Sequence, residues 1–566
     1  MRSLKSSFVE LDARSRARAV LDRGTFREIV GPFDQLESPH LLRQGIVPQS
    51  DDGVVVARGT IAGESAVAIS IEGKFQGGGI GEISGSKIAG ALELALQDNE
   101  KGVRTRPVLL LDTGGVRLQE ANYGLLSIAE IGAAVVALRQ FVPVVGVIPG
   151  KIGCFGGMSI VAGLCSFLLM TREGRLGLNG PEVIEQEAGM EEFDSSDRPL
   201  IWNTIGGAKR FSGGLADRVV DDDVPVITEA IRAVFAQGVV KLHRSSQVER
   251  FLPLLQQEGM SLQNEHEDQD SRDPDDLQDP KEHLSSQDPH DWTNDQGTKE
   301  SRGKNWFAAL GGTAHSATAE VPSVLCADTN IGTERVRLLA VVPNPHSRFP
   351  RARQGEVGLE EGWMIAKYVR EAMEADKEGE RRAIVAIVDV PSQAYGYREE
   401  LLGIHQALAA AVDAYAEARL AGHPVIALLV GKAISGAFLA HGFQANRILA
   451  LDDKEVSVHA MSKQSAARIT RRTMEELEEA TKKVPAMAYD IQSFATLGAL
   501  HDLIDGVSAD RPDRKDRERV AGKIREAIES ARSASRHLDN RLKSAEAQEG
   551  RAASLLVRKK LAEQWM

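Results

Sequence analysis

The stretches Val108–Glu120, VLLLDTGGVRLQE, and Pro143–Met158, PVVGVIPGKIGCFGGM, share one design. Each is a short apolar run of β type that ends in a glycine turn and leads into a helix. Such a turn leaves backbone N–H groups at a helix start, where they suit a developing negative charge. We therefore expect the two turns to carry the chemistry of the protein. The residues concerned are Gly114, Gly115, Val116, Gly156, Gly157 and Met158.

The composition is that of an ordinary soluble globular protein, with 42% hydrophobic and 26% charged residues. A chain of 566 residues is too long for one core, which favours two domains of roughly 200–280 residues. The net charge of −13 argues against nucleic acid or an anionic membrane as the main partner. Because the sequence has no run of about 18 apolar residues and no signal-peptide core, we expect a cytoplasmic protein.

The pattern around the two turns predicts a layered α/β fold. Residues 54–72 alternate and turn at Gly63 like a hairpin, and a helix is expected over about 84–97. Strands at 108–111 and 143–148 are each followed by a predicted helix, over about 119–140 and 157–170. Strands separated by helices need crossover connections, so the sheet should be largely parallel.

A glycine-rich loop, FQGGGIGEIS, joins the hairpin to its helix. It lacks the GxGxxG spacing and the Walker lysine-serine pair, so nucleotide binding is weakly supported. Close packing of strand against helix explains it equally. A third interpretation is a loop whose backbone binds a thioester and its pantetheine arm. The residues that would do so are Gly77, Gly78, Gly79 and Ile80.

The composition changes sharply over 264–300. This segment is rich in acidic residues, has three Asp-Pro steps, and contains only Leu277, Leu284 and Trp292 as large apolar residues. It cannot build a core, which predicts a disordered acidic linker. We expect one domain over 1–255, the linker over 256–303, and a second domain over 304–566.

The two units contain an internal repeat. Residues 143–151, PVVGVIPGK, line up with residues 424–432, PVIALLVGK, and Asp112 lines up with Asp389. Similar spacing between these features suggests one domain fold used twice, although two buried strands can resemble each other by chance. The second copy has Pro391, Ser392 and Gln393 in place of the glycine turn. Two facing domains with unequal turns would form one composite site with two different anion pockets.

Several motifs resemble a known family. VLLLDTGGVRLQEA, FQGGGIGEISGSKIAGA, GKIGCFGGMS and LGLNGPEVIEQEAG are similar to the carboxyltransferase branch of the crotonase superfamily, and more narrowly to the β subunit of biotin-independent malonate decarboxylase. RFPRARQGEVGLEEGW, VAIVDVPSQAYGYREELLGIH, HPVIALLVGKAISGAFLAHG and VSVHAMSKQSAARITRR resemble its γ subunit. The resemblance implies a β–γ fusion with two tandem crotonase-like (carboxyltransferase) domains, each a layered β-β-α superhelix with flanking helices.

The resemblance also implies a reaction. A malonyl thioester on the phosphopantetheine arm of a separate acyl-carrier protein loses CO₂, and the acetyl thioester returns to a malonate/acetyl transferase subunit. This chain would itself bind no cofactor. Its three cysteines make no zinc or disulfide set, and it has no AMKM-like biotinylation segment. The alternatives are a biotin-dependent acyl-CoA carboxyltransferase and a non-catalytic scaffold for the carrier protein. The sequence leaves homo-oligomer formation open.

Within this interpretation, the amides of the first half would stabilise an enolate oxygen. A tight arginine pair on the departing carboxylate would stabilise the ground state and slow the reaction. A weak backbone pocket suits it better, and the candidates are Gly431, Ser435, Gly436 and Ala437. Contacts to the carrier arm or carrier protein are assigned to Arg348, Arg351 and Arg353, with a solvated basic turn as the alternative.

The enolate must finally take a proton on carbon. By residue type and nearness to the turns, the candidates are Cys154, Tyr395, Tyr397, His405 and His459, with Cys154, Tyr395 and His459 retained as the leading three. A packing role explains each of them as well, and water could serve instead. The remaining acidic residues of this region, Glu182, Glu185 and Glu187, are expected on a solvated helix face.

Overall fold

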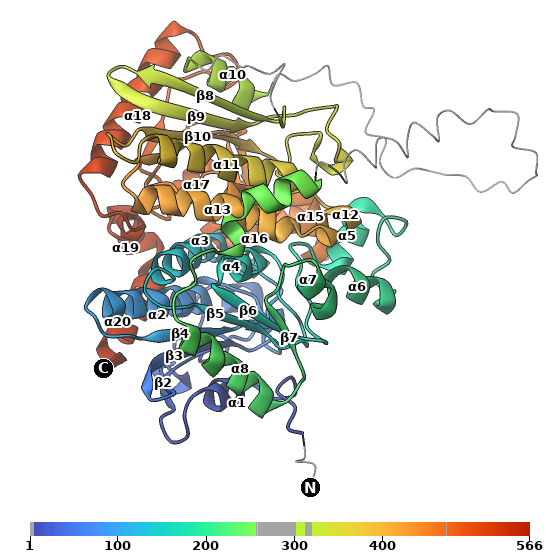
Figure 1. The fold of residues 1–566 in the computed structure, drawn as a ribbon. Coiled ribbons are helices and arrows are strands. Elements are labelled where there is room, and N and C mark those ends of the chain that lie inside the picture. Colours follow the sequence, from blue (N-terminus) through green and yellow to red (C-terminus); the bar gives the residue numbers. More distant parts are fainter. Residues whose placement is uncertain (1–4, 256, 258–300, 312–319, 471) are drawn as a thin grey trace, which may run out of the picture.

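The computed structural model describes residues 5–255, 257, 301–311, 320–470 and 472–566. Most of the predicted acidic linker lies outside the described residues. Two seven-stranded sheets lie one above the other, and helices fill the space between them (Figure 1). We call the elements up to residue 257 the first half and those from residue 301 the second half. The two tandem α/β sheets are the architecture that the sequence predicts.

The first sheet follows the order of the chain, β1 to β7. The pairs β1–β2 and β2–β3 are antiparallel, and every later pair is parallel, as the crossover helices require. The strands are β1 (Arg27–Ile29), β2 (Val54–Ile61), β3 (Glu64–Ile71), β4 (Arg106–Leu110), β5 (Val145–Ile148), β6 (Phe167–Thr171) and β7 (Arg218–Val220).

The helices of the first half cover both faces of this sheet. They are α1 (Ala13–Val20), α2 (Glu82–Glu100), α3 (Ala121–Leu138), α4 (Gly157–Leu164), α5 (Pro181–Ala188), α6 (Arg198–Ile205), α7 (Gly207–Ser212) and α8 (Val224–Gln237). The segment Leu118–Leu138 is apolar and long enough to cross a membrane, but it is entirely buried in the protein. All residues of α3 are buried, which is the pattern of a core helix.

The second sheet has the order β14-β12-β11-β10-β9-β8, with β13 paired to β11. Its strands are β8 (Val324–Ile331), β9 (Glu334–Val341), β10 (Ala383–Val390), β11 (Val425–Ile434), β12 (Arg447–Leu451), β13 (Ser457–His459) and β14 (Asp502–Ile504). Its helices are α10 (Arg302–Ala309), α11 (Leu359–Ala375), α12 (Tyr397–Leu401), α13 (Ile404–Leu420), α14 (Ser435–Ala440), α15 (Lys463–Thr470), α16 (Met474–Lys483), α17 (Ile491–Ala495), α18 (Arg514–Arg532), α19 (Ala545–Gly550) and α20 (Ala552–Gln564).

The strand register agrees with the predicted repeat. Val108 of β4 pairs with Val145 of β5, and Val385 of β10 pairs with Ile426 of β11. The alignment of residues 143–151 with residues 424–432 therefore holds in three dimensions.

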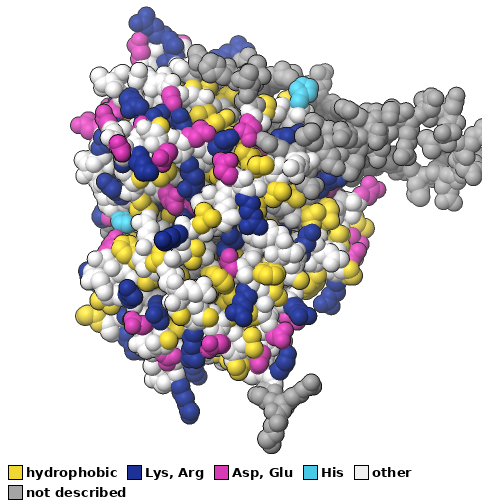
Figure 2. Space-filling view, in the orientation of Figure 1, with side chains coloured by type: hydrophobic (Ala, Val, Ile, Leu, Met, Phe, Trp, Pro, Cys, Tyr) yellow, Lys and Arg dark blue, Asp and Glu magenta, His cyan; other side chains and the backbone are white. Residues whose placement is uncertain are grey.

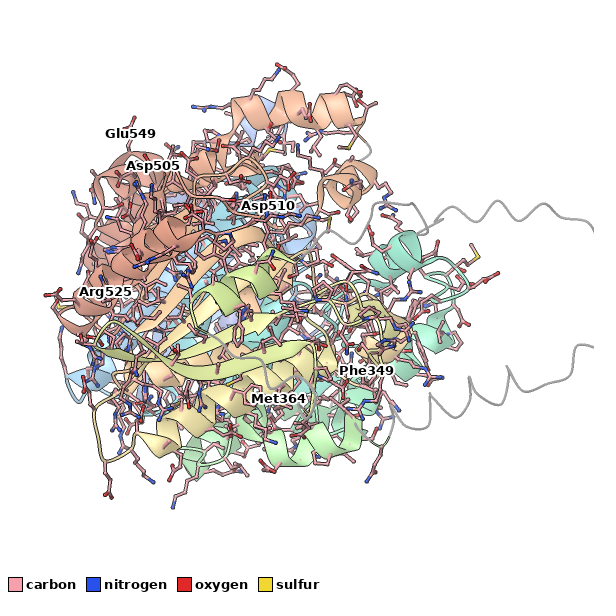
Figure 3. The ribbon with its side chains drawn as sticks, turned by 90° about the horizontal axis from the view of Figure 1, so that it is seen from above. Phe349, Met364, Asp505, Asp510, Arg525 and Glu549 are labelled. Atoms are coloured by element: carbon pink, nitrogen blue, oxygen red, sulfur yellow. The ribbon has the colours of Figure 1, made fainter. Side chains whose placement is uncertain are left out.

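A helix precedes the hairpin in both halves, α1 in the first and α10 in the second. Seen from above, Asp510 lies near α10, where it forms an ion pair with Arg302 at 2.7 Å (Figure 3).

One element prediction is wrong. The helix expected over 157–170 ends at Leu164, and Phe167–Thr171 forms β6, which pairs with β5. A short buried apolar run fits a strand as well as a helix, so periodicity could not separate them.

The second half extends over the first through its C-terminal segment. Helix α20 packs on α2, as Figure 1 shows at the lower left. The buried guanidinium of Arg551 donates two hydrogen bonds to Glu130 of α3. At the end of the chain, the Trp565 indole N–H donates to Asp98 at 3.0 Å. The outer surface mixes both signs of charge over the face seen in Figure 2.

Candidate active site at the contact between the halves

Asp112 connects the two predicted turns of the first half. Its Oδ1 accepts hydrogen bonds from the N–H groups of Ile152 at 2.8 Å and Gly153 at 3.2 Å. Its Oδ2 forms an ion pair with Arg16 of α1 at 2.9 Å. Asp112 and Arg16 are both buried, so these charged hydrogen bonds are strong ones. The turn after β4 is thereby fixed to the turn after β5.

Three of the six predicted amides already have partners inside the chain. The Gly114 N–H donates to the carbonyl of Gly77 at 2.8 Å, and the Gly115 N–H donates to Thr113 Oγ1 at 3.0 Å. The Gly156 N–H donates to the Leu178 carbonyl at 2.9 Å. These amides hold the turns in place, so they do not provide open donors. The sequence alone could not separate them from the others.

The other three amides have no hydrogen-bond partner among the described residues. They belong to Val116, Gly157 and Met158, and the last two are in the first turn of α4. Gly115 and Gly156 pack against each other with φ of 102° and 57°, and a Cβ on Gly115 would lie 3.0 Å from Gly156 Cα. The glycines therefore bring the Val116 amide next to the start of α4. Open donors at one place form the arrangement of an oxyanion hole.

The glycine-rich loop packs directly on this turn. Thr113 Oγ1 donates to the Gly78 carbonyl at 2.6 Å, and Ile80 forms a bridge with Val116. A Cβ on Gly78 would overlap the carbonyl oxygen of Asp112. Gly78 thus has a packing role, because only glycine allows this backbone approach. Gly77, which is exposed, has open space around it.

The second half repeats the backbone path of this turn. Val357 forms a bridge with Gln393 as Ile80 does with Val116. Ser435 at the start of α14 has φ of 56°, which matches the 57° of Gly156 at the start of α4. A positive φ is rare for a residue with a side chain. Because Ser435 adopts it all the same, the fold requires this backbone conformation at the start of α14.

The side chain at the matching position closes the second pocket. Gln393 Oε1 accepts a hydrogen bond from the Gly436 N–H at 3.1 Å, and Gln393 Nε2 donates to Asn179 Oδ1 at 3.0 Å. The Ala437 N–H has no partner among the described residues. A Cβ on Gly431 would overlap the Asp389 carboxylate, so this glycine allows close packing.

The starts of α4 and α14 meet across the contact between the halves. A Cβ on Gly157 would lie 2.8 Å from Leu439 Cδ1 of α14. A Cβ on Gly436 would lie 3.5 Å from Leu178 Cδ1 of the first half. The structure therefore brings together the two turns that the sequence analysis predicted as parts of one composite site.

Two of the three basic-turn arginines form ion pairs within the chain. Arg348 pairs with Glu360, and Arg351 pairs with Glu192 of the first half at 3.1 Å. Arg353 is exposed, and its Nε donates to the Ser347 carbonyl at 3.1 Å. Of the three, Arg353 is the most exposed.

The three proton-donor candidates differ in their surroundings. Cys154 is fully buried, and burial raises the pKa of its thiol well above the usual value. Tyr395 is half-buried without a hydrogen-bond partner among the described residues, and burial followed by the charges of Glu187 and Glu356 raises the pKa of its phenol. Both groups therefore keep their protons at neutral pH.

His459 has a different environment. Its Nδ1 contacts the Met461 carbonyl at 2.8 Å, and its ring stacks on Tyr489 with centroids 3.8 Å apart. Burial lowers its pKa to about 4, so the ring is neutral at pH 7. The two lesser candidates are also packed: Tyr397 lies against Phe193, and His405 is fully buried.

Sequence reasoning missed the polar side chains that hold the composite site together. Asn179 lies in the LGLNGP motif and Glu400 in the YREELLGIH motif, and both are buried at the contact between the halves. Their partners are more than 200 residues away in the chain, which no local pattern reveals. Among the described residues, no group of three or more His, Cys, Asp or Glu side chains could hold a metal ion.

Both halves of the chain resemble known proteins. The family model "Malonate decarboxylase gamma subunit" matches residues 352–565, and the "Carboxyl transferase domain" model matches residues 10–280. The malonyl-S-ACP:biotin-protein carboxyltransferase MADC of Malonomonas rubra is 42% identical over 246 residues, which are 42% of this chain and 77% of that protein.

Two further relatives each cover less than half of the chain. The malonyl-S-ACP:biotin-protein carboxyltransferase MADD of the same organism is 44% identical over 170 residues, 29% of this chain and 58% of that protein. A chain of a Pseudomonas malonate decarboxylase hetero-tetramer, solved in complex with malonate, is 60% identical and covers 44% of this chain and 91% of that chain, with a TM-score of 0.44. The chain belongs to the malonate decarboxylase family, with a carboxyl transferase region and a gamma-subunit region on one polypeptide.

Proposed function

We propose that this chain is a carboxy-lyase that releases CO₂ from a malonyl thioester of acyl-carrier protein and leaves the acetyl thioester. The observation that carries the proposal is the cluster of open amides on Val116, Gly157 and Met158, set against the second half. A family relationship suggests the chemistry, but a site is needed to perform it. Open amides at a helix start meet that need.

The amides would act on the charge that develops during bond cleavage. The bond between the carboxylate carbon and the α-carbon breaks, its electron pair moves toward the thioester carbonyl, and CO₂ leaves. The thioester oxygen becomes an enolate oxygen, which the N–H groups of Val116 and Gly157 would hold. Each fixed donor of this kind is worth roughly 3 kcal/mol in the transition state. Internal hydrogen bonds fix both turns, so the N–H donors do not have to move when the charge develops on the thioester oxygen.

The second half would receive the carboxylate end of the malonyl group. Gly436 already donates to Gln393, so the open groups there are the Ala437 N–H and the Ser435 hydroxyl. Such a pocket orients a carboxylate without strong charge pairing. That suits a group that must lose its charge as CO₂ forms.

The enolate carbon then takes a proton, which gives the acetyl thioester. We assign this step to Tyr395, because it is half-buried, keeps its proton at neutral pH and follows directly on the Gln393 turn. Cys154 and His459 are less suited, since the thiol is fully buried and the Nδ1 of His459 already contacts Met461. A proton from solvent would restore the phenol after each turnover.

The proposal also covers the location, partners and cofactors of the chain. We infer a cytoplasmic multi-subunit complex in which an acyl-carrier protein presents the substrate and a transferase subunit reloads malonate. The exposed Gly77 and Arg353 are proposed contacts for the pantetheine arm and its phosphate. The chain is proposed to use neither biotin nor a metal. The two Malonomonas relatives are named for transfer to a biotin protein, which makes biotin the alternative to test.

The test is CO₂ release by the full chain from malonyl-S-acyl-carrier protein, with and without avidin. We expect release of CO₂ and formation of acetyl thioester at the same rate in both. A requirement for an added biotin protein, or inhibition by avidin, would contradict direct decarboxylation and favour carboxyl transfer. Absence of CO₂ release in both arms would reject the enzymatic function.

A further inference from the structure

Glu400 of α12 reaches from the second half into the first. Its Oε1 accepts the Asn179 backbone N–H at 2.6 Å and the Asn179 side-chain amide at 3.1 Å. Its Oε2 accepts the Leu178 N–H at 3.1 Å and lies 3.5 Å from Arg210 Nη2. Glu400 has no exposed surface, so it is a buried carboxylate used entirely to hold a first-half loop.

The loop that Glu400 holds is the one that supports the open amides. The carbonyl of Leu178 accepts the Gly156 N–H, and Gly156 is the residue immediately before α4. Two residues, Leu178 and Gly156, therefore link the Glu400 carboxylate to the helix start that offers the Gly157 and Met158 amides. A shift of this loop would move the donors relative to the thioester oxygen.

The same loop connects to the second turn. Asn179 Nδ2 donates to the Ala394 carbonyl at 3.1 Å, and Asn179 Oδ1 accepts from Gln393. Gln393 in turn accepts the Gly436 N–H at the start of α14. A continuous set of hydrogen bonds thus runs from the start of α4, through Leu178 and Asn179, to the start of α14.

Other buried charges across the contact lie away from the turns. Asp413 of α13 accepts from Ser245 Oγ at 2.7 Å and pairs with Arg139 of the first half and with Arg370. It is as buried as Glu400 and also joins the two halves. It has no hydrogen bond to either predicted turn. Asp413 therefore provides a matched control for the loss of a buried carboxylate at this contact.

We propose that Glu400 is a positioning residue for the decarboxylation: by holding Leu178 and Asn179, the second half sets the amides of Gly157 and Met158 in the first. The inference rests on the proposed function and explains why the two halves must be together for catalysis. Placement errors of about 1 Å are enough to reduce turnover by about 10²-fold. Glu400 itself does not contact the substrate.

The test uses Glu400→Gln in the full chain, with malonyl-CoA and malonyl-S-acyl-carrier protein as substrates. The glutamine amide has nearly the same size as the glutamate carboxyl group. Its NH₂ group cannot accept a hydrogen bond, so some of the N–H donors that Glu400 satisfies would lose their acceptor. We expect kcat to fall roughly 10- to 100-fold while KM changes less than about threefold, because the lost alignment acts in the transition state. Glu400→Asp, which keeps the carboxyl group but shortens the reach, should give an intermediate kcat.

The control Asp413→Asn should lower the melting temperature and leave kcat close to that of the parent chain. Parent kcat in soluble Glu400→Gln, or an equal loss of kcat in Asp413→Asn, would overturn the inference. If Glu400→Gln does not fold, Glu400→Asp with the kcat of the parent would overturn it too. Failure of the proposed function is a separate result, because then the parent chain itself would release no CO₂.

Discussion

The turns after β4 and β10 occupy matching places in the two halves. Pro391, Ser392 and Gln393 replace the glycine turn in the second half, and Gln393 makes the difference that matters for the donors. Val116 has no polar side-chain group, and the helix start beside it is open. Gln393 stands at the matching position, and its amide oxygen accepts the Gly436 N–H. The same backbone path thus gives an open donor site in one half and a filled one in the other. One position decides whether a repeated turn can bind a ligand's oxygen.

The comparison also explains why the halves differ in substrate contact. An open helix start can take a full developing charge, which suits an enolate. At the start of α14, the Gly436 N–H already donates to the neutral Gln393 amide, so fewer donors remain there for a second acceptor. We therefore place the enolate in the first half and the carboxylate against the second.

The largest expected effect is on the glycine contact of the first half. Gly115→Ala would place a Cβ 3.0 Å from Gly156 Cα at φ of 102° and so displace the Val116 amide. We expect kcat for CO₂ release to fall by about 10²- to 10³-fold, the loss typical of one oxyanion donor. Gly63→Ala is the control, because it has φ of 78° at a hairpin tip with nothing near it. Equal losses in both variants would show a folding defect only.

A smaller effect is expected at the filled site. Gln393→Ala would leave the Gly436 N–H and Asn179 Oδ1 without their partner. Buried groups left unsatisfied cost about 1–3 kcal/mol each, so the melting temperature should fall. We expect kcat to fall only about tenfold, since the first-half donors stay in place. Val116→Ala is the matched variant and should change stability less. A kcat loss in Gln393→Ala as large as in Gly115→Ala would contradict the assignment of unequal roles.

The helices that follow the loops give a third contrast. The Gly81 N–H before α2 donates to Ser84 Oγ at 2.9 Å, whereas the Gly358 N–H before α11 donates to Glu361 Oε2 at 3.1 Å. Burial raises the pKa of Glu361 to about 7, although Ser323 Oγ donates to it at 2.5 Å. Below about pH 7, the Glu361 cap of the second half is therefore mostly protonated in the folded protein, whereas the Ser84 hydroxyl of the first half does not titrate.

This contrast predicts a pH dependence. Between the ordinary glutamate pKa of 4.5 and about 7, folded Glu361 binds a proton that unfolded Glu361 has lost. Stability should therefore decrease as pH rises through this range, by at most about 1.4 kcal/mol per pH unit. Glu361→Gln should flatten that slope in urea unfolding. An unchanged slope in Glu361→Gln would show that the carboxyl is ionised in the folded protein.

Local patterns were enough to predict many of the elements. The hairpin of β2 and β3 turns at Gly63, and β5 lies within the predicted residues 143–148, because alternation and β-branched runs are local signals. The site was predicted less completely. Which amides are open depends on the carbonyls of Gly77 and Leu178, and these come from other segments. A glycine pair in the sequence indicates a turn, but only the tertiary contacts show which N–H groups of the turn already donate a hydrogen bond within the protein.

The smallest effect is expected from cutting the chain between the halves. Residues 258–300 lie outside the described structure, so a protease site placed there leaves every contact discussed above intact. The halves remain joined by Glu400 on the Leu178 loop and by the buried Arg551–Glu130 pair, where α20 packs on the first half. We expect the cut protein to elute as one species and to keep its kcat. Separation into two species would show that the contact is too weak to hold the composite site without the covalent link, and that the fusion itself maintains the two unequal turns in register.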